Sequence, residues 1–183
     1  MHAILIMMLA ASPDASNPSI DFDTRVIPVL TKAGCNTGAC HGAAAGRGDF
    51  RLSLYGSDPE FDHRSIAFEL EGRRVNLANP DESLLLLKAT ESINHGGGPR
   101  LEFEGPGVKL LQQWIDEGAS RTSSTPLKQF SVQPETTVLS GVGETIDLRA
   151  AAEFSHGEVE DVTKWTVFTP EDPAAVEVES KTG

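Results

Sequence analysis

Cys35-Asn36-Thr37-Gly38-Ala39-Cys40-His41 holds the only two cysteines of this 183-residue chain, and a histidine directly follows the second of them. A Cys…Cys-His run is how haem is attached covalently: both thiols add to vinyl groups of the porphyrin, and the histidine binds the iron. The usual spacing has two residues between the cysteines, and this chain has four. Gly38 would let the longer loop fold back, because glycine tolerates a positive φ. The stretch predicts one covalent haem c on Cys35 and Cys40, with His41 as an axial iron ligand.

Two other chemistries remain open for the cysteine pair. A disulfide between Cys35 and Cys40 would close a small loop and stabilise the chain little. A zinc site would need a fourth ligand besides both cysteines and His41, and His63 or His95 could supply it. Structural zinc sites usually combine two short-spaced ligand pairs, and the sequence has no second pair of that kind.

The N-terminus resembles an export signal. Residues 3–11 are all apolar, and a polar segment follows them. Such a run is too short to span a bilayer, which takes about 20 residues, but it suits the apolar part of a secretory signal. We therefore expect residues 1–19 to be a signal peptide and the protein to be exported to the periplasm or the cell surface. No other segment is long and apolar enough to be transmembrane, so we expect no membrane span after signal removal.

Composition divides the rest of the chain. Residues 20–121 contain helical patterns joined by glycine-rich connections, residues 122–127 form a polar linker, and residues 128–183 contain short alternating segments. Residues 20–121 hold 15 acidic and 11 basic residues, whereas residues 122–183 hold 11 and 4, so most of the net charge of −12 lies in the second part. Neither part has the basic patch typical of nucleic-acid binding, and we expect no nucleic-acid partner.

Within residues 20–121 the apolar spacing predicts four helices. Pro28 interrupts the first of them, which we expect to be short or kinked. Asn79-Pro80 is a strong helix start, because a capping residue is followed by proline at the first helical position. Alternation over residues 50–55 predicts an extended segment. The helices are expected at residues 21–32, 59–70, 79–90 and 107–119.

Four short motifs occur in order along the same part: Val26-Ile27-Pro28-Val29-Leu30, Cys40-His41-Gly42, Pro80-Asp81-Glu82-Ser83-Leu84-Leu85 and Trp114-Ile115-Asp116-Glu117-Gly118-Ala119. Together they resemble the planctomycete-type cytochrome c-like domain of large exported proteins, which is related to monohaem class I cytochrome c. The resemblance implies an all-α haem domain in which a helix precedes the attachment motif, a loop supplies the second axial ligand and a terminal helix crosses the first. It also implies one-electron transfer to a redox partner protein that the sequence does not identify.

The second axial ligand is expected to be a histidine. Met1, Met7 and Met8 are the only methionines and lie in the predicted signal, so the mature protein could not use the usual methionine ligand. His95 opens a Gly-Gly-Gly-Pro segment at the place where the resembled domains present their loop methionine. We expect bis-histidine ligation by His41 and His95.

Other candidates for the sixth ligand are less favoured. His63 lies near the apolar side of the predicted 59–70 helix, where a histidine with satisfied hydrogen bonds is the usual case. Lys88 is a remote candidate, since a surface lysine normally keeps its ammonium group in water. An open sixth position would permit ligand sensing or peroxidase-like chemistry. The sequence has no catalytic-triad pattern, so it favours an electron carrier over an enzyme.

Residues 128–183 have the pattern of a β domain. Residues 145–154 alternate as in a half-buried strand, residues 155–158 form a turn, and residues 159–168 supply a further strand with Trp165 in the core. The segment resembles the bacterial immunoglobulin-like (BIG2-like) domain at Gly143-Glu144, Phe154-Ser155-His156-Gly157, Asp161-Val162-Thr163 and Trp165. The resemblance implies a partial all-β immunoglobulin-like sandwich that belongs to a longer polypeptide.

The sequence thus predicts a multidomain chain, in which an all-α cytochrome c-like haem domain is followed by an incomplete all-β immunoglobulin-like sandwich. Its predicted function is that of an exported monohaem c-type cytochrome domain. The alternative is a non-redox binding or interaction module of a larger surface protein, with a structural metal or a disulfide at the cysteine pair.

Overall fold

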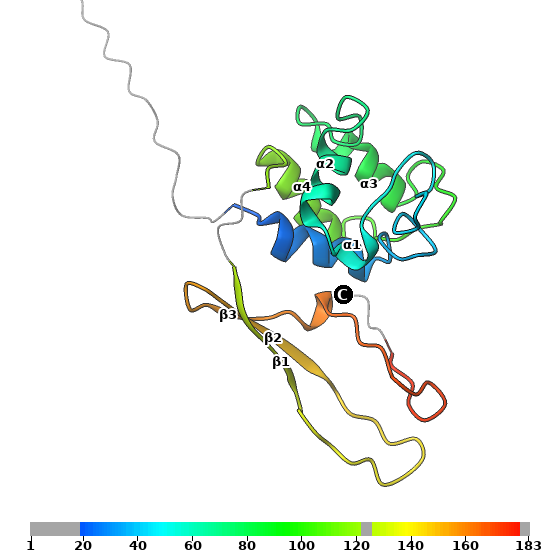
Figure 1. Ribbon diagram of the computed structural model, residues 1–183, viewed down its shortest axis with the longest axis vertical. Helices are drawn as coiled ribbons and strands as arrows, with labels where there is room; N and C mark the ends of the chain where they lie inside the picture. The colour runs from blue at the N-terminus through cyan, green and yellow to red at the C-terminus, as the bar shows by residue number, and fades with distance from the viewer. Residues whose placement is uncertain (1–18, 122–125, 180–183) are drawn as a thin grey trace, which may run out of the picture.

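The computed structural model describes residues 19–121 and 126–179 of the chain (Figure 1). The predicted signal at residues 1–19 lies outside this part except for Ser19, and so does most of the predicted linker at residues 122–127. The helices gather in one part of the molecule, and the strands form an elongated antiparallel ribbon beside it (Figure 1). Among the described residues, no helix has the length and apolarity needed to cross a bilayer.

The described fold contains four α-helices and one three-stranded sheet, together with short π-helical and 3-10-helical turns. In chain order the helical elements are η1 (Phe22–Val26), α1 (Ile27–Lys32), η2 (Leu54–Gly56), α2 (Pro59–Ala67), η3 (Pro80–Glu82), α3 (Leu84–Ala89) and α4 (Pro106–Asp116). They are followed by β1 (Leu127–Gln133), β2 (Arg149–Phe154), β3 (Val159–Asp161) and η4 (Thr163–Trp165).

The first helix changes its winding just before Pro28, in agreement with the predicted interruption. η1 is a π-helical turn, and the Asp21 carboxylate caps its start by accepting the N–H of Thr24 at 2.9 Å. Pro28 then occupies the first turn of α1, where no helical hydrogen bond is lost. Gly34 ends α1 with φ +74°, and the N–H groups of Gly34 and Cys35 donate to carbonyls of the last helical turn. This Schellman arrangement leads the chain directly into the cysteine stretch.

The helices predicted at residues 59–70 and 107–119 are confirmed as α2 and α4, with shifted bounds. The Asp58 carboxylate caps α2 at its predicted start. The predicted 79–90 helix is split, because Ser83 adopts an extended conformation (ψ 127°) between η3 and α3. The extended segment predicted at residues 50–55 is not a strand: an isolated bridge joins Arg47 and Phe50, and η2 follows.

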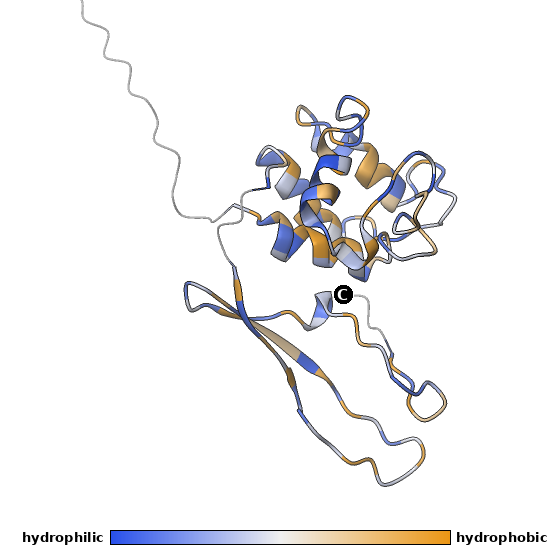
Figure 2. Ribbon diagram, viewed as in Figure 1, coloured by the Kyte–Doolittle hydropathy of each residue, from blue (hydrophilic) through white to orange (hydrophobic). Residues whose placement is uncertain are grey.

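The helical core lies between η1, α1, α2, α4 and the segment around Leu52. The rings of Phe22 and Trp114 lie 5.3 Å apart, and the indole N–H of Trp114 donates to the Ser120 carbonyl at 2.9 Å. Figure 2 shows apolar residues concentrated along these helices. The largest fully buried apolar side chains here are Phe22, Leu30, Leu52, Ile66, Leu111, Trp114 and Ile115. Their burial holds η1 and α4 together, close to the cysteine stretch.

The sheet is antiparallel in the order β1-β2-β3. Phe130 pairs with Ala152, and Ala152 pairs with Glu160 on the other side. Ala150, Ala152 and Phe154 are buried while the residues between them are more exposed, which confirms the predicted alternation. The paired strand is shorter than predicted.

The predicted fold class is wrong. The described chain is a mixed α and β structure rather than an all-α haem domain followed by an immunoglobulin-like sandwich, because its described residues form one small sheet with no second sheet facing it. The strands instead contact the helices. The Arg25 guanidinium lies 4.9 Å over the Phe154 ring and forms an ion pair with Glu160, and Trp165 packs against the helical core. Helices therefore supply contacts that a second sheet would supply in a sandwich.

Candidate functional site

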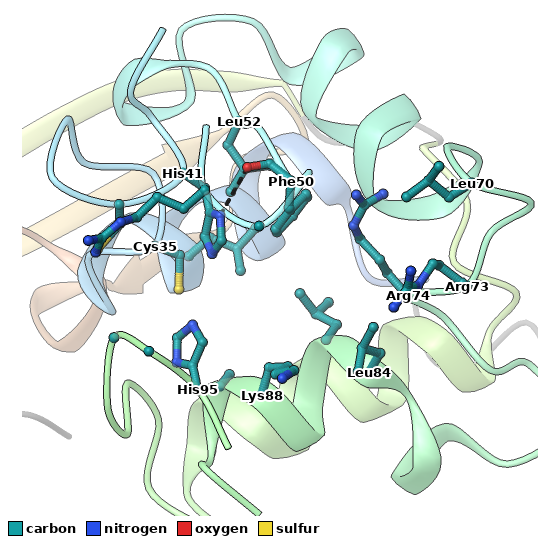
Figure 3. A pocket seen from close by; sticks show the side chains of 18 residues that line it. Cys35, His41, Phe50, Leu52, Leu70, Arg73, Arg74, Leu84, Lys88 and His95 are labelled. Carbon is teal, nitrogen blue, oxygen red and sulfur yellow. Dashed lines mark hydrogen bonds between the residues drawn. The ribbon is translucent and has the colours of Figure 1, made fainter. Parts of the chain in front are cut away.

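A cavity of about 490 Å³ lies between the cysteine stretch, α3 and the loop after α3 (Figure 3). Binding sites for small molecules usually measure about 300–1,000 Å³ and have mostly apolar walls. The lining residues are Leu30, Cys35, Cys40, His41, Arg47, Gly48, Phe50, Leu52, Leu70, Arg73, Arg74, Leu84, Leu85, Lys88, Ala89, His95, Gly96 and Gly97. The fold thus brings the four favoured site residues, Cys35, Cys40, His41 and His95, to one cavity.

The cysteine stretch is a compact loop at the end of α1. The N–H of His41 donates to the Cys35 carbonyl at 2.9 Å, and Cys40 lies at the turn between them. Both cysteines line the cavity, and Figure 3 shows the sulfur of Cys35 pointing into it. The four-residue spacing therefore still places two thiols at one site.

Two glycines shape this loop: Gly42, which belongs to one of the quoted motifs, and Gly34, which no sequence pattern indicated. The positive φ expected at Gly38 is found at Gly34, where it closes the helix. Gly42 is required for a different reason: a Cβ at this position would overlap the backbone carbonyl of Asn36. The cysteine loop can therefore close only with glycine directly after His41.

Both cysteines are free thiols in this structure. Cys40 is buried and Cys35 is half-buried. Burial raises the pKa of the Cys35 thiol to about 12, and the neighbouring Cys40 adds to the effect. Cys35 is therefore a neutral thiol in the metal-free chain.

His41 projects from the loop into the cavity. Its Nδ1 lies 3.1 Å from the Phe50 carbonyl, which can only accept, so Nδ1 carries the proton and Nε2 holds the lone pair. Burial lowers the pKa of His41 more than this hydrogen bond raises it, and the nearby His95 lowers it further. The imidazole is therefore neutral, with Nε2 as its ligand atom.

His95 reaches the cavity from the opposite side. Its Nδ1 donates to the Gly98 carbonyl at 2.8 Å, and the N–H of Gly98 (φ +72°) donates back to the His95 carbonyl at 2.9 Å. The loop is tied to α3, because Lys88 Nζ donates to the Asn94 carbonyl and two backbone N–H groups donate to the Ala89 carbonyl. His95 thus also presents Nε2 as its ligand atom.

The two imidazoles face each other across the cavity (Figure 3). Their ring centres are 6.3 Å apart and their planes are inclined by 17°. An imidazole nitrogen lies about 2.0–2.1 Å from a bound metal ion, so two imidazoles on opposite sides of one ion have ring centres roughly 6–6.5 Å apart. The observed ring-centre separation lies in this range, and the two rings are nearly parallel.

His63 lies outside this cavity. Its Nε2 is 2.8 Å from the Ala119 carbonyl, and its ring packs edge-on against Phe22 at 5.0 Å and Phe68 at 5.4 Å. The described residues contain no group of three or more His, Cys, Asp or Glu side chains that could hold a metal ion.

Cationic side chains form the part of the site that sequence reasoning missed. Arg47, Arg73 and Arg74 line the cavity, together with Lys88, and no acidic side chain lines it within the described structure. The only available signal was the adjacent Arg73-Arg74 pair in an acidic chain, and its meaning depends on tertiary placement.

Comparison of the chain with protein-family models, curated proteins and solved structures finds no match. The chemistry of the cavity therefore carries the functional inference.

Proposed function

We propose that this chain is an exported monohaem c-type cytochrome domain whose function is one-electron transfer. Cys35 and Cys40 hold haem c through thioether bonds, and His41 and His95 are the axial ligands of its iron. The observation that carries the proposal is the pair of facing imidazoles, 6.3 Å apart, in the same cavity as the two thiols. The motif resemblance across residues 20–121 supports the same cofactor.

The donor set suits porphyrin iron. A porphyrin provides four nitrogen atoms to the iron, so the protein supplies only two ligands, one on each face. Two facing imidazoles meet that requirement, whereas a structural zinc site takes four protein ligands. When bound, the haem would supply an iron that accepts and releases one electron, between Fe(III) and Fe(II).

The other lining residues prepare the cavity for such a group. The carbonyls of Phe50 and Gly98 fix the tautomer and the orientation of both imidazoles, as outer partners of metal-bound histidines usually do. Leu30, Leu52 and Leu85 are buried in the wall and exclude water. Because methionine ligation raises the potential of haem iron, a bis-histidine set gives a lower reduction potential than a methionine–histidine set.

The predicted signal at residues 1–19 supports the export that this proposal includes. We place the function in the periplasm or at the cell surface, with a protein as redox partner. Attachment through Cys35 and Cys40 would retain the cofactor in such an environment without dependence on its free concentration.

Mass spectrometry of the natively exported protein tests the proposal. We expect the peptide with residues 35–41 to carry the mass of one haem, and the Soret absorbance to survive denaturation and acid–acetone extraction. A Cys35→Ala/Cys40→Ala variant exported by the same host is the matched control and should lose both signals. Colourless wild-type protein without added mass would overturn the proposal.

A further inference from the structure

The cavity has a charged end that the proposed thioethers and axial ligands do not use. Arg73 and Arg74 lie together on one side of it, away from Cys35 (Figure 3). Arg47 and Lys88 also line the cavity, and within the described structure no Asp or Glu does. Since the chain carries a net charge of −12, four cations around one cavity reverse the charge locally.

Arg74 is the buried member of this group. It is 5% exposed, and its guanidinium lies 4.4 Å from the centre of the Phe50 ring. Nη1 donates to the Ser65 carbonyl at 2.7 Å, and Nη2 donates to the Asp49 carbonyl at 2.6 Å. These neutral acceptors orient the guanidinium without neutralising it. Its ion-pair partner among the described residues, Glu69, is 3.8 Å away with a side chain that is 41% exposed.

A buried guanidinium with so little counter-charge favours an anion beside it. Burial lowers the pKa of Arg74 more than Glu69 raises it, so desolvation is not fully offset. Arginine stays protonated in proteins, and its planar donors pair with carboxylates through two parallel hydrogen bonds. Arg73, the exposed neighbour, provides a second guanidinium at the cavity edge.

We propose that Arg73 and Arg74 form a carboxylate-binding site that takes the two propionate groups of haem. This inference rests on the proposed function and adds the orientation of the cofactor to it. The vinyl and propionate groups lie on different sides of the porphyrin, and Cys35 and the two arginines lie on different sides of the cavity (Figure 3). Arg74 is held by its two carbonyl acceptors and fixes the position of the propionate groups. Arg73 binds a propionate group from the surface side.

Esterification of the ligand separates the carboxylate contact from the rest of the binding. The full chain with Cys35→Ala and Cys40→Ala takes porphyrin without covalent attachment, and it is titrated with haem and with haem dimethyl ester, with the Soret band as readout. Charge-assisted hydrogen bonds contribute enough for haem to bind about 10–100-fold more tightly than its ester. Arg73→Gln in the same background should reduce this ratio at least about tenfold. Arg64→Gln, an exposed arginine outside the cavity, should leave it unchanged.

The outcomes distinguish the site from the proposed function. Equal affinities for haem and its ester, with a clear Soret change for both, would overturn the carboxylate site. The proposed function as a haem protein would not be affected. No Soret change with either ligand would overturn the proposed function and this inference with it. Because Arg74→Gln would leave a packed and hydrogen-bonded position empty, Arg74→Lys is the second variant, and a retained preference ratio in both Arg73→Gln and Arg74→Lys would count against the site.

Free dicarboxylates could also supply the carboxylate groups that Arg73 and Arg74 bind. Calorimetry of the haem-free chain with succinate separates the two sources. We expect no binding at millimolar succinate, because two guanidinium groups at an open edge lack the apolar contacts that porphyrin adds. Submillimolar succinate binding that Arg73→Gln abolishes would assign the site to a free dicarboxylate and would overturn the assignment to haem.

Discussion

The two histidine-bearing segments of the cavity differ in how the fold supports them. His41 follows a Schellman helix end and the buried Cys40, and its carbonyl accepts the N–H of buried Leu52 at 2.8 Å. His95 sits in an exposed loop, tied to the fold mainly through Lys88 and backbone bonds to the Ala89 carbonyl. The backbone of His41 is thus tied to a buried residue, whereas His95 is held by a few contacts at the surface.

This difference predicts a division of roles between the ligands. A segment with few buried contacts opens locally at a small cost in free energy, whereas a segment in the core opens only when the fold does. His41 should therefore remain on the iron whenever the protein is folded, and His95 should exchange with external ligands. The experiments below test that asymmetry.

Removal of each histidine should have the largest effect and the clearest contrast. A change to the outer partner of a metal-bound histidine already costs about 10–100-fold in metal affinity, so His41→Ala should reduce the haem content of exported protein at least about tenfold. His95→Ala should keep the covalent haem and convert its absorption spectrum from low-spin to high-spin, because one axial position opens. Haem content by pyridine haemochrome and the visible spectrum measure both effects.

Two results would contradict this contrast. An unchanged spectrum in His95→Ala would remove His95 from the ligand set. Equal haem loss in both variants would mean that the two segments are equally important for holding the cofactor. His63→Ala is the matched control, because His63 lies outside the cavity, and its spectrum should stay low-spin.

A methyl group at Gly42 should disturb the first segment alone. Because its Cβ would overlap the Asn36 carbonyl, Gly42→Ala should lower the free energy of unfolding by about 1–3 kcal/mol, the usual cost of overpacking. Gly96→Ala is the control on the second segment: nothing lies within 4 Å of a Cβ there, and we expect a change below about 0.5 kcal/mol. Urea unfolding of both variants measures the difference, and similar losses would refute the claim that only the first segment is tightly packed.

The sequence identified four residues that line the cavity, but not the charge around them. Cys35, Cys40 and His41 lie in one seven-residue stretch, and His95 was favoured by the lack of methionine after the predicted signal and by the motif resemblance. The pairing of Arg74 with a cavity depends on contacts with residues 9 and 25 positions away, which no local pattern encodes.

The fold class failed for a related reason. The alternation of β2 specifies which face of the strand is buried, and it does not specify what covers that face. Phe154 lies under the Arg25 guanidinium from η1, so at this position the helical part supplies cover that a sandwich would take from a second sheet. The one capping residue predicted from the sequence, Asn79, makes no side-chain capping hydrogen bond, whereas Asp21 and Asp58 cap η1 and α2.

The contact between helices and sheet allows a further test. It asks whether the difference between the His41 and His95 segments depends on the helical part alone. Arg25 and Glu160 form a bidentate ion pair with side chains 26% and 25% exposed, and its hydrogen bonds lower the pKa of Glu160. Glu160→Gln should cost about 0.5–1.5 kcal/mol at pH 7. It should leave the spectrum and the ligand exchange of the haem unchanged, because neither residue lines the cavity.

The sign of the pH dependence follows from the depressed pKa of Glu160. The ion pair stabilises the fold fully above the ordinary carboxyl pKa of 4.5, and the contribution is lost as the pH falls through the lowered value. Wild type should therefore lose its advantage over Glu160→Gln as the pH falls below 4.5. Thermal melts at several pH values measure this, and a constant difference in Tm down to pH 3 would exclude the ion pair as its source.

Lys88→Gln should give the smallest change in stability and the most specific change in the second segment. The ammonium group holds the Asn94 carbonyl one residue before His95, and loss of one exposed hydrogen bond costs about 0.5–1 kcal/mol at most. If that cost falls on loop opening, cyanide should bind the ferric protein about two- to fivefold faster, since 1.4 kcal/mol corresponds to a factor of ten. Lys109→Gln, an exposed lysine of α4, is the control and should not change the rate. Only a contact that restrains the His95 loop can alter the rate at which the loop opens. A Lys88→Gln protein with reduced stability but an unchanged cyanide-binding rate would therefore mean that the backbone bonds to α3, and not the lysine, hold His95.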